Sequence, residues 1–253
     1  MFLERLDVLA SEGLNPEVYL DGVHLDRATP EELAVVRAGV DKHGMRLTVH
    51  GPYMDTHPGG PDDDEMEATA RRFARALDVL EVLRPEVAVF HAGYDRKRFG
   101  GDEGLWCEQS LRTWAPLVER AEAMGVTIAV ENIYERGPGP MKRLVEAVDS
   151  PRFRACLDTG HLNVCSKVDP GEWVEALGDK VAEVHLHDNH GKKDEHLPPG
   201  EGTFDFRGFL VLLERHSPGA VFTLEQHDEA AVRKAVRSLT SIMDEAAGLM
   251  GEK

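Results

Sequence analysis

Strand-length apolar segments alternate with amphipathic helical segments along the chain, and this alternation constrains the fold more than any other feature. Such a pattern is typical of parallel strands joined by right-handed helical crossovers. A length of 253 residues suits a single α/β barrel. The sequence therefore predicts one α/β domain over residues 1–253, with strands at 18–20, 46–50, 86–91, 126–131, 153–158, 181–186 and 220–225.

Helical signals fill the intervals between these strands. Thr29-Pro30-Glu31-Glu32 has the form of a capping box with proline in the first turn. Seven strands are one fewer than a closed eight-stranded barrel needs, so the first strand is not evident in this chain. Either the opening residues form a poor strand, or an upstream segment is absent. Helices are expected at 2–10, 30–43, 62–83, 103–124, 141–148, 171–177, 205–215 and 229–249.

Composition excludes several classes of protein. Lys and Arg number 29 against 46 Asp and Glu, which gives a net charge of −17 and argues against a broad nucleic-acid or acidic-membrane surface. The three cysteines form no CxxC pair, so neither a disulfide framework nor a thiolate zinc site is indicated. No apolar run approaches the roughly 18 residues of a membrane span. These features predict a cytoplasmic protein with no membrane partner.

Polar side chains end most of the expected strands. Period-2 alternation turns His50, His91 and Glu131 toward the interior of the barrel. The same alternation turns Asp158 and Glu225 inward, and a Thr-Gly turn after Asp158 is expected to bring the next histidine of the chain, at position 161, back toward it. Catalytic residues of α/β barrels lie at the carboxyl ends of strands. We therefore expect these side chains to form a site.

The stretch 181–202 carries the densest group of such residues. His185 and His187 share one face at the end of an apolar strand, and Asp194 and His196 follow on the next loop. Imidazoles grouped with carboxylates are typical metal ligands. The alternative is a histidine-rich surface loop, which explains any single histidine but not the group. His187 is interpreted as either a spare ligand or a partner of a ligand.

These residues carry a family resemblance over about residues 46–226. The motifs are HGPY, FHAG, AVEN, CLDTGH, HLHD, DEH followed by GEG, and LEQ. In order and strand placement they resemble the endonuclease IV branch of the xylose isomerase-like barrels, the AP endonuclease family 2. The resemblance implies a (β/α)8 TIM barrel with a divalent metal site at its mouth. The nuclease branch holds three zinc ions through nine side chains, which here match His50, His91, Glu131, Asp158, His161, His185, Asp194, His196 and Glu225.

The sugar isomerase and epimerase branch holds one metal, and its ligands match Glu131, Asp158, His185 and Glu225. Charge supports a metal independently, because four converging carboxylates repel one another unless cations neutralise them. Mixed imidazole and carboxylate ligands favour Zn²⁺ or Mn²⁺ over Mg²⁺ or Ca²⁺. We expect one to three ions per chain.

Two functions remain open. As a metal-dependent isomerase or epimerase of a small sugar or sugar phosphate, the protein would use Glu131 and Glu225 as proton shuttles, with His161 as a further catalytic candidate. As an endonuclease IV-like AP endonuclease, it would hydrolyse a phosphodiester at an abasic site and push Tyr53 and Met54 into the duplex. A catalytically inactive barrel is disfavoured, because the ligand set is intact.

Surface charge favours the isomerase. The segments after Leu20 and Glu225 are acidic, whereas a duplex needs several basic contacts to phosphates. A small anionic carbohydrate is therefore the expected partner, and nucleic acid is a partner only under the alternative. The oligomeric state is left open. Basic residues predicted on loops at the barrel mouth are Arg96, Lys97, Arg98, Arg136, Lys142, Arg143, Lys192 and Lys193.

Overall fold

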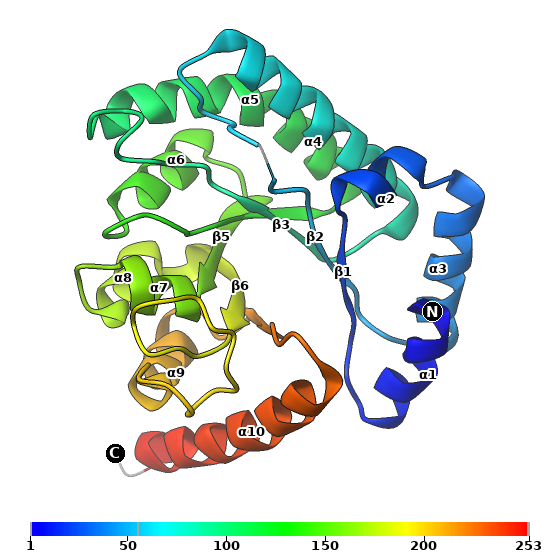
Figure 1. Cartoon of the computed structure of the whole chain (residues 1–253), viewed down its shortest axis with the longest axis vertical. Helices are drawn as coiled ribbons and strands as arrows, with labels where there is room; N and C mark the ends of the chain where they lie inside the picture. The colour runs from blue at the N-terminus through cyan, green and yellow to red at the C-terminus, as the bar shows by residue number, and fades with distance from the viewer. Residues whose placement is uncertain (1, 55, 252–253) are drawn as a thin grey trace. The chain divides into compact units, whose positions relative to one another are not determined.

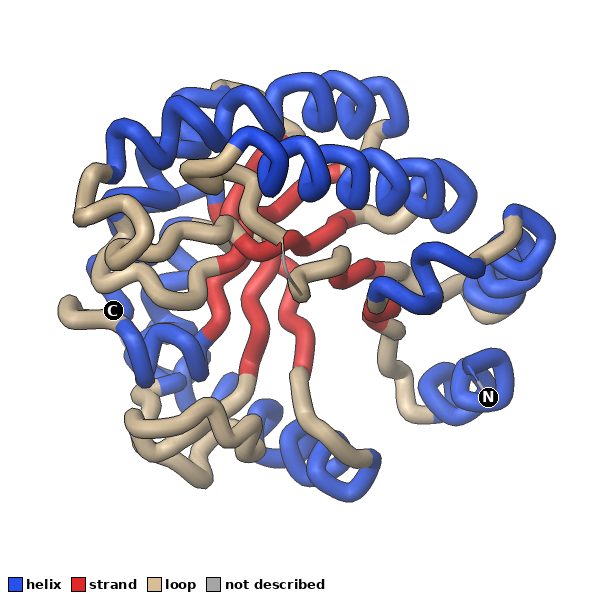
Figure 2. The backbone as a smooth tube through the Cα atoms, turned by 45° about the horizontal axis from the view of Figure 1, so that its top comes forward, coloured by secondary structure: helices blue, strands red, loops and turns tan. Residues whose placement is uncertain are grey.

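The computed structural model describes residues 2–54 and 56–251. Seven strands occur among them, and they follow one another in the sheet in the order of the chain. Figure 1 labels them: β1 (Glu17–Tyr19), β2 (Thr48–His50), β3 (Val87–His91), β4 (Thr127–Glu131), β5 (Phe153–Asp158), β6 (Val181–Leu186) and β7 (Val221–Leu224). Each corresponds to one of the seven predicted segments. Figure 2 shows these strands (red) alternating along the chain with helices (blue).

The helices also follow the prediction, with two additions. Those expected are α1 (Phe2–Ser11), α3 (Pro30–Lys42), α4 (Asp63–Leu83), α5 (Glu103–Met124), α6 (Gly139–Val148), α8 (Pro170–Leu177), α9 (Phe206–His216) and α10 (Glu229–Gly251). The additions are the short helices α2 (Gly22–Arg27) and α7 (Thr159–Cys165), and a 3-10 turn, η1 (Gly178–Lys180), precedes β6. The segment after Leu20 is therefore partly helical rather than a loop, because the Asp21 side chain caps α2 by accepting from the His24 N–H.

Two compact units make up the described chain. Unit 1 contains Met1–Gly93, Gly104–Val130 and Ala147–Phe153, and unit 2 contains Tyr94–Glu103, Glu131–Glu146 and Arg154–Lys253. Parallel pairing joins β1 to β2 and β2 to β3 in unit 1. In unit 2, β5 pairs with β6 and β6 with β7, again in parallel. The prediction of one domain over residues 1–253 stays a prediction.

An aromatic core anchors unit 1. Phe73 of α4 stacks on Trp114 of α5 with ring centroids 5.0 Å apart, and Phe90 of β3 meets the same indole edge to face at 5.7 Å. Gly51 follows β2 where no larger residue fits, because a Cβ there would come within 2.3 Å of the Phe90 ring. The predicted capping box is confirmed, since Thr29 and Glu32 exchange hydrogen bonds between side chain and backbone.

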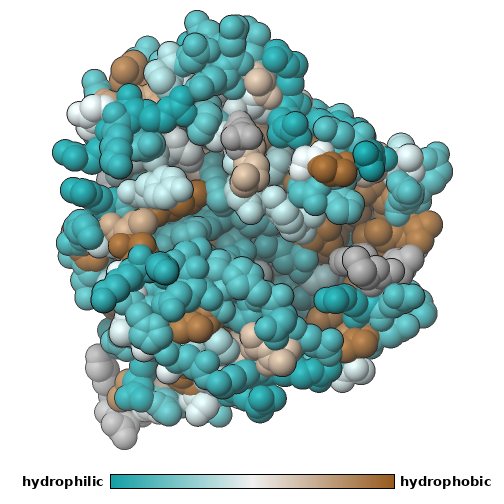
Figure 3. Space-filling view, viewed as in Figure 1, coloured by the Kyte–Doolittle hydropathy of each residue, from teal (hydrophilic) through white to brown (hydrophobic). Residues whose placement is uncertain are grey.

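The helices of unit 2 pack on its strands and on one another. Contacts join α7 to β6, α8 to α9, α9 to α10 and α10 to β7. Hydrophilic side chains prevail on the face shown in Figure 3, in keeping with the net charge of −17. Across residues 2–54 and 56–251, the helices fall short of the length and hydropathy that crossing a bilayer requires.

Candidate metal centre

Three buried side chains meet at the carboxyl ends of strands in unit 2. Glu131 ends β4, Asp158 ends β5, and His185 lies on β6 opposite Asp158 in the parallel register. All three are at most 1% exposed, and one ligand atom from each lies within 4.8 Å of the others. His185 Nδ1 is 3.6 Å from Glu131 Oε2 and 4.0 Å from Asp158 Oδ2. We call Glu131, Asp158 and His185 the strand-end triad.

Glu225 joins this triad from the neighbouring strand. Pairing of His185 with Thr223 places the end of β7 beside the triad, and Glu225 follows directly after β7. Its Oε1 lies 3.2 Å from His185 Nδ1, and its side chain is 23% exposed. The four residues implied by the isomerase resemblance are therefore together in unit 2, with one carboxylate accessible to solvent.

His161 reaches the triad from α7 rather than from the predicted turn. The Asp158 carboxylate caps this helix by accepting from the His161 N–H at 2.6 Å, so the residues after β5 continue into a helical turn. His161 Nδ1 lies 3.2 Å from Glu131 Oε1, and Nε2 lies 3.4 Å from Asp194 Oδ2. Burial alone would lower the pKa of His161, but the Asp158, Asp194 and Glu131 carboxylates hold it well above its usual value.

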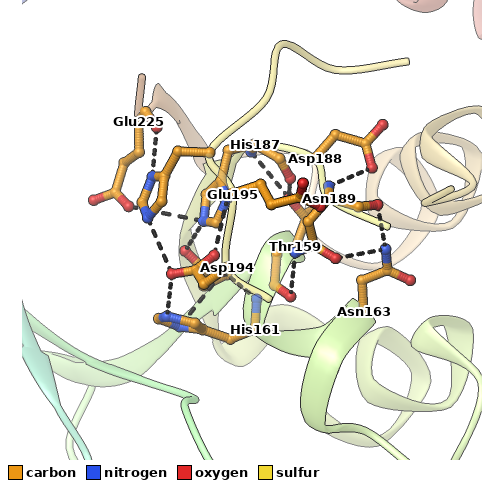
Figure 4. A network of polar contacts seen from close by, with 12 residues as sticks. Thr159, His161, Asn163, His187, Asp188, Asn189, Asp194, Glu195 and Glu225 are labelled. Atoms are coloured by element: carbon orange, nitrogen blue, oxygen red, sulfur yellow. Dashed lines mark hydrogen bonds and ion pairs between the residues drawn. The ribbon is translucent and has the colours of Figure 1, made fainter. Parts of the chain in front are cut away.

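Asp194 and His196 enter from the loop that follows β6. His196 Nε2 lies 3.0 Å from Asp194 Oδ2, and Nδ1 donates to the Glu225 carbonyl at 2.7 Å. Burial opposes the charged forms, yet hydrogen bonds from His161 and His196 hold the pKa of Asp194 far below its usual value. The bonds of His196 to Asp194 and to the Glu225 carbonyl outweigh its burial and raise its pKa to about 9. Figure 4 shows Asp194 between His161 and His187.

His50 and His91 end neighbouring strands in unit 1. Their rings meet edge to face with centroids 5.3 Å apart. Tyr53 stacks on His91 at 4.7 Å, and Tyr19 stacks on Tyr53 at 5.3 Å, so the two histidines belong to a cluster of four rings that the sequence did not predict. The other seven predicted ligands belong to unit 2. A single centre made from all nine stays a prediction.

The sequence profile described as the xylose isomerase-like TIM barrel matches residues 15–242. The chain belongs to this family. Membership confirms the predicted α/β TIM-barrel class. An uncharacterized protein of Methanocaldococcus jannaschii, MJ1311, is 28% identical over 246 residues, which cover 94% of this chain and 81% of that protein.

Solved structures of other proteins are similar over 88% to 96% of this chain. A D-tagatose 3-epimerase-like protein is 26% identical, with a TM-score of 0.81 over 92% of this chain and 90% of that one. A Thermus thermophilus protein, TTHB071, soaked with ZnCl2, is also 26% identical, with a TM-score of 0.81 over 96% and 93% of the two chains. D-psicose 3-epimerase in the presence of D-fructose, 18% identical with a TM-score of 0.72 over 88% and 78%, shares the fold.

Two buried acids of this barrel escaped the sequence interpretation. Glu183 lies on β6 two residues before His185, is fully buried, and accepts a hydrogen bond from the Thr223 hydroxyl. Period-2 alternation places it on the His185 face, which was the available signal. Glu135 lies in the loop after β4 and accepts from the Ile133 N–H at 2.6 Å. No periodic pattern covers that loop, so its burial could not be predicted.

One part of the predicted basic surface needs correction. Lys142 and Arg143 lie on α6, not on a loop, and Lys142 faces Glu146 at 3.8 Å. Both residues fall inside the helix that the sequence predicts over 141–148, so their placement on a loop was inconsistent with that prediction, and the helix begins two residues earlier still, at Gly139. The remaining basic residues follow β3, β4 and β6 and are exposed, as solvated charges at strand ends should be: Arg96, Lys97, Arg98, Arg136, Lys192 and Lys193.

The buried carboxylate of Asp188 closes the loop that carries Asp194 and His196. Asp188 also exchanges backbone hydrogen bonds with Leu197 in both directions, at 2.7 and 2.9 Å. A carboxylate that accepts hydrogen bonds from several backbone N–H groups fixes the position of the segments that donate them. The carboxylate therefore organises the loop from 189 to 204. Its four donors are the N–H groups of Asn189, Gly200, Gly202 and Phe204, at 2.8 to 3.2 Å.

We predict that Asp188→Asn loosens this loop. The amide nitrogen of asparagine would face backbone N–H donors that have lost their acceptor, and each unsatisfied buried donor costs about 1–3 kcal/mol. Urea unfolding should show a free energy of unfolding lowered by about 3 kcal/mol, with faster tryptic cleavage at Lys192 and Lys193. The exposed Glu195→Gln in the same loop is the control. If Asp188→Asn unfolds and is cleaved like the parent, the Asp188 carboxylate does not hold the loop.

We predict a pH-dependent contribution from Glu135. Burial raises the pKa of Glu135 to about 7 from an ordinary value of 4.5. Between pH 4.5 and about 7, Glu135 keeps its proton in the folded state and loses it in the unfolded chain. Its contribution to folding stability is therefore complete below pH 4.5 and is lost as the pH rises through about 7.

Glu135→Gln removes this dependence but keeps an acceptor for the Ile133 N–H. Between pH 4.5 and pH 8, metal-free parent protein should lose on the order of 3 kcal/mol of unfolding free energy relative to this variant, at about 1.4 kcal/mol per pKa unit. Urea unfolding across that range measures the difference, and the exposed Glu67→Gln is the control. Identical pH profiles for the parent and Glu135→Gln would show that the carboxyl titrates normally.

Proposed function

We propose that the chain is a divalent-metal-dependent isomerase or epimerase of a small sugar or sugar phosphate. One observation carries the proposal: His185 lies between two glutamates, with Nδ1 at 3.2 Å from Glu225 Oε1 and 3.6 Å from Glu131 Oε2, beside the buried Asp158. The 26% identity to a D-tagatose 3-epimerase-like protein supports the same class of chemistry.

The donors fit a divalent ion. Glu131 and Asp158 are carboxylates buried to at least 99%, a placement that is costly without positive charge beside them. His161 supplies such charge in the protein without metal, because its carboxylate neighbours raise its pKa. A site of two or three carboxylates and imidazoles is typical of Zn²⁺ and Mn²⁺. Glu131, Asp158, His185 and Glu225 would hold the ion.

A bound ion would polarise the carbonyl of the substrate and make the proton on the adjacent carbon more acidic. Glu225 is the accessible base, because its carboxylate is 23% exposed whereas that of Glu131 is 1% exposed. One glutamate takes the proton from the carbon, and the other returns a proton to its opposite face for epimerisation. Return to the neighbouring carbon gives isomerisation. His161 faces Glu131 at 3.2 Å and orients it, which is its proposed catalytic part.

Exposed cations support an anionic substrate. Arg136 follows β4, and Lys192 and Lys193 follow β6, the strands that carry Glu131 and His185. Loops after strands face the catalytic end of a barrel, where they can contact a phosphate or a polar hydroxyl. We propose that these residues, with Arg96, Lys97 and Arg98, favour sugar phosphates over neutral sugars.

The alternative is an endonuclease IV-like nuclease with a multinuclear zinc site. It is favoured by the arrangement of His161, Asp194 and His196, in which Asp194 Oδ2 lies 3.4 Å from one imidazole and 3.0 Å from the other. A second or third ion would use these donors. Exposure of Tyr53 and Met54 is also compatible with contact to a duplex. The net charge of −17 opposes that substrate, so we place it second.

We predict that metal content depends on both glutamates. Glu131→Gln and Glu225→Gln each remove one charged ligand and should weaken metal binding at least about tenfold. A loss of that size is typical even when the mutated residue only hydrogen-bonds to a metal ligand. Elemental analysis of protein purified without chelator gives the number and identity of ions per chain. The exposed Glu229→Gln on α10 is the matched control. Equal metal content in the parent and both ligand variants would show that the site is assigned wrongly.

We predict proton exchange on a sugar rather than cleavage of DNA. Metal-loaded protein incubated in deuterated water with ketoses and ketose phosphates should incorporate deuterium at the carbon next to the carbonyl, as measured by NMR. Glu225→Gln should slow this exchange by about a hundredfold or more, the usual contribution of a positioned base.

The same preparations are offered a duplex with an abasic site. Phosphodiester hydrolysis breaks no carbon–hydrogen bond, so a nuclease has no route to sugar exchange. Duplex incision that falls steeply with salt, together with no exchange into any sugar, would favour the nuclease instead.

A further inference from the structure

His187 is a fully buried histidine whose ring is hydrogen-bonded to the end of β5 and whose backbone is hydrogen-bonded to the start of α7. Its ring Nε2 lies 2.8 Å from Asp158 Oδ2, a hydrogen bond to a proposed metal ligand. Its backbone N–H donates to the Thr159 hydroxyl at 3.1 Å, and that hydroxyl donates to the His187 carbonyl at 2.8 Å. Figure 4 shows the ring close to Asp194, whose Oδ1 lies 3.5 Å from His187 Nδ1. Both the backbone and the ring of His187 are therefore held.

The faces of the His187 ring are equally restricted. On one side it stacks on the His196 ring, with centroids 3.9 Å apart and planes 4° from parallel. Near the ring edge, Gly160 leaves the needed room, because a Cβ at that position would lie 2.0 Å from His187 Cε1. A larger residue at 160 would displace the imidazole. The ring thus touches Asp158 through its nitrogen and His196 through its face.

His187 and His196, with Glu225, offer donor atoms within 4.8 Å of one another, which first indicates a metal site. The ring geometry argues against one ion shared by both imidazoles. A metal lies close to the plane of the imidazole that binds it, at about 2.1 Å from nitrogen. An ion in the plane of the His196 ring would lie well out of the parallel His187 plane. Moreover, His187 Nε2 is engaged with Asp158, and Nδ1 faces Asp194 Oδ1 at 3.5 Å.

We propose that His187 is a positioning residue that orients the proposed metal ligand Asp158 and, through its stacked face, the ring of His196. Its hydrogen bond directs Asp158, and its stacked face fixes the ring plane of His196. The Asp158 carboxylate has one oxygen on the N–H of His161 and the other on His187, so the two bonds define its rotation. The inference deepens the proposed function and rests on it. His187 links the strand-end triad to the loop that carries Asp194 and His196.

Three substitutions separate the two contacts. His187→Gln keeps an N–H near the position of Nε2 and loses the stacked ring. His187→Phe keeps a ring against His196 and loses the bond to Asp158, and His187→Ala loses both. The exposed His190→Ala in the same loop, whose ring contacts Glu195, is the matched control.

The readouts are the dissociation constant for Zn²⁺, from competition with a chromophoric chelator, and the visible absorption spectrum of the Co²⁺-loaded protein, which reports ligand geometry. His187→Ala should weaken Zn²⁺ binding about tenfold to a hundredfold and alter the Co²⁺ spectrum. His187→Gln should restore most of the affinity, because it restores the bond to Asp158. His187→Phe should bind Zn²⁺ nearly as weakly as His187→Ala. His190→Ala should match the parent.

Parent-like Zn²⁺ affinity and Co²⁺ spectra in both His187→Gln and His187→Phe would overturn the proposal, whether or not His187→Ala folds. Equal weakening in His187→Gln and His187→Phe, with altered unfolding of the metal-free proteins, would show a packing role only and would also overturn it. If the parent itself binds neither ion, the proposed metal-dependent function fails, and this inference fails with it. A parent that binds metal while the variants bind equally well overturns the inference alone.

Discussion

Two carboxylates removed from water, those of Glu131 and Asp158, are the constraint on which the candidate centre depends. A buried carboxylate is costly unless hydrogen bonds or positive charges compensate it. In this chain the compensation comes from histidines: His161 and His185 lie between 3.2 and 4.0 Å from the two acids. Opposing charges of this kind hold the pKa of His161 high and that of Asp158 low despite burial. A divalent ion would take over this charge, which is why the same residues suit metal binding.

The loop after β6 extends the centre, and its own backbone is held by a second buried acid. The Asp188 carboxylate accepts hydrogen bonds from four backbone N–H groups, and the loop that these bonds hold carries Asp194 and His196. His196 adopts a left-handed backbone with φ of 50°, uncommon for a residue with a side chain. Its Nδ1 hydrogen bond to the Glu225 carbonyl and its stacking on His187 stabilise that conformation. Backbone strain therefore occurs at a residue that the sequence predicts to be a metal ligand.

The residues that hold the candidate centre in shape differ from those that can contact a substrate. Asp188 and His187 are fully buried, whereas Glu225 and Asp194 keep part of their surface in solvent. Rigid, enclosed groups fix geometry, and the partly exposed carboxylates are the ones that a substrate can reach. In a parallel barrel these two layers arise from successive residues of one strand end and the loop after it. The proposed sugar chemistry needs both layers.

Periodicity along the chain was enough to determine the strands and most of the helices, and the motifs at the strand ends indicated the family. Each of the seven predicted strands is present, because the buried strands of a parallel sheet are short, mostly apolar segments that can be recognised locally. The grouping of Glu131, Asp158, His185 and Glu225 also followed, since parallel strands bring their carboxyl ends to one edge. The joint use of His50 and His91 with these residues stays a prediction.

Tertiary structure decided what depends on contacts between distant residues. Helix α7 replaced a predicted turn because the side chain of Asp158 serves as its cap, a choice that alternation alone does not show. The burial of Glu135 arises from a loop whose path no periodic pattern predicts, and the bond between His187 and Asp158 joins two strand ends through atoms that alternation does not specify. The sequence by itself determined which residues reach the end of each strand. Which of them touch, and through which atom, was decided by packing, because a hydrogen bond depends on positions to within a few tenths of an ångström.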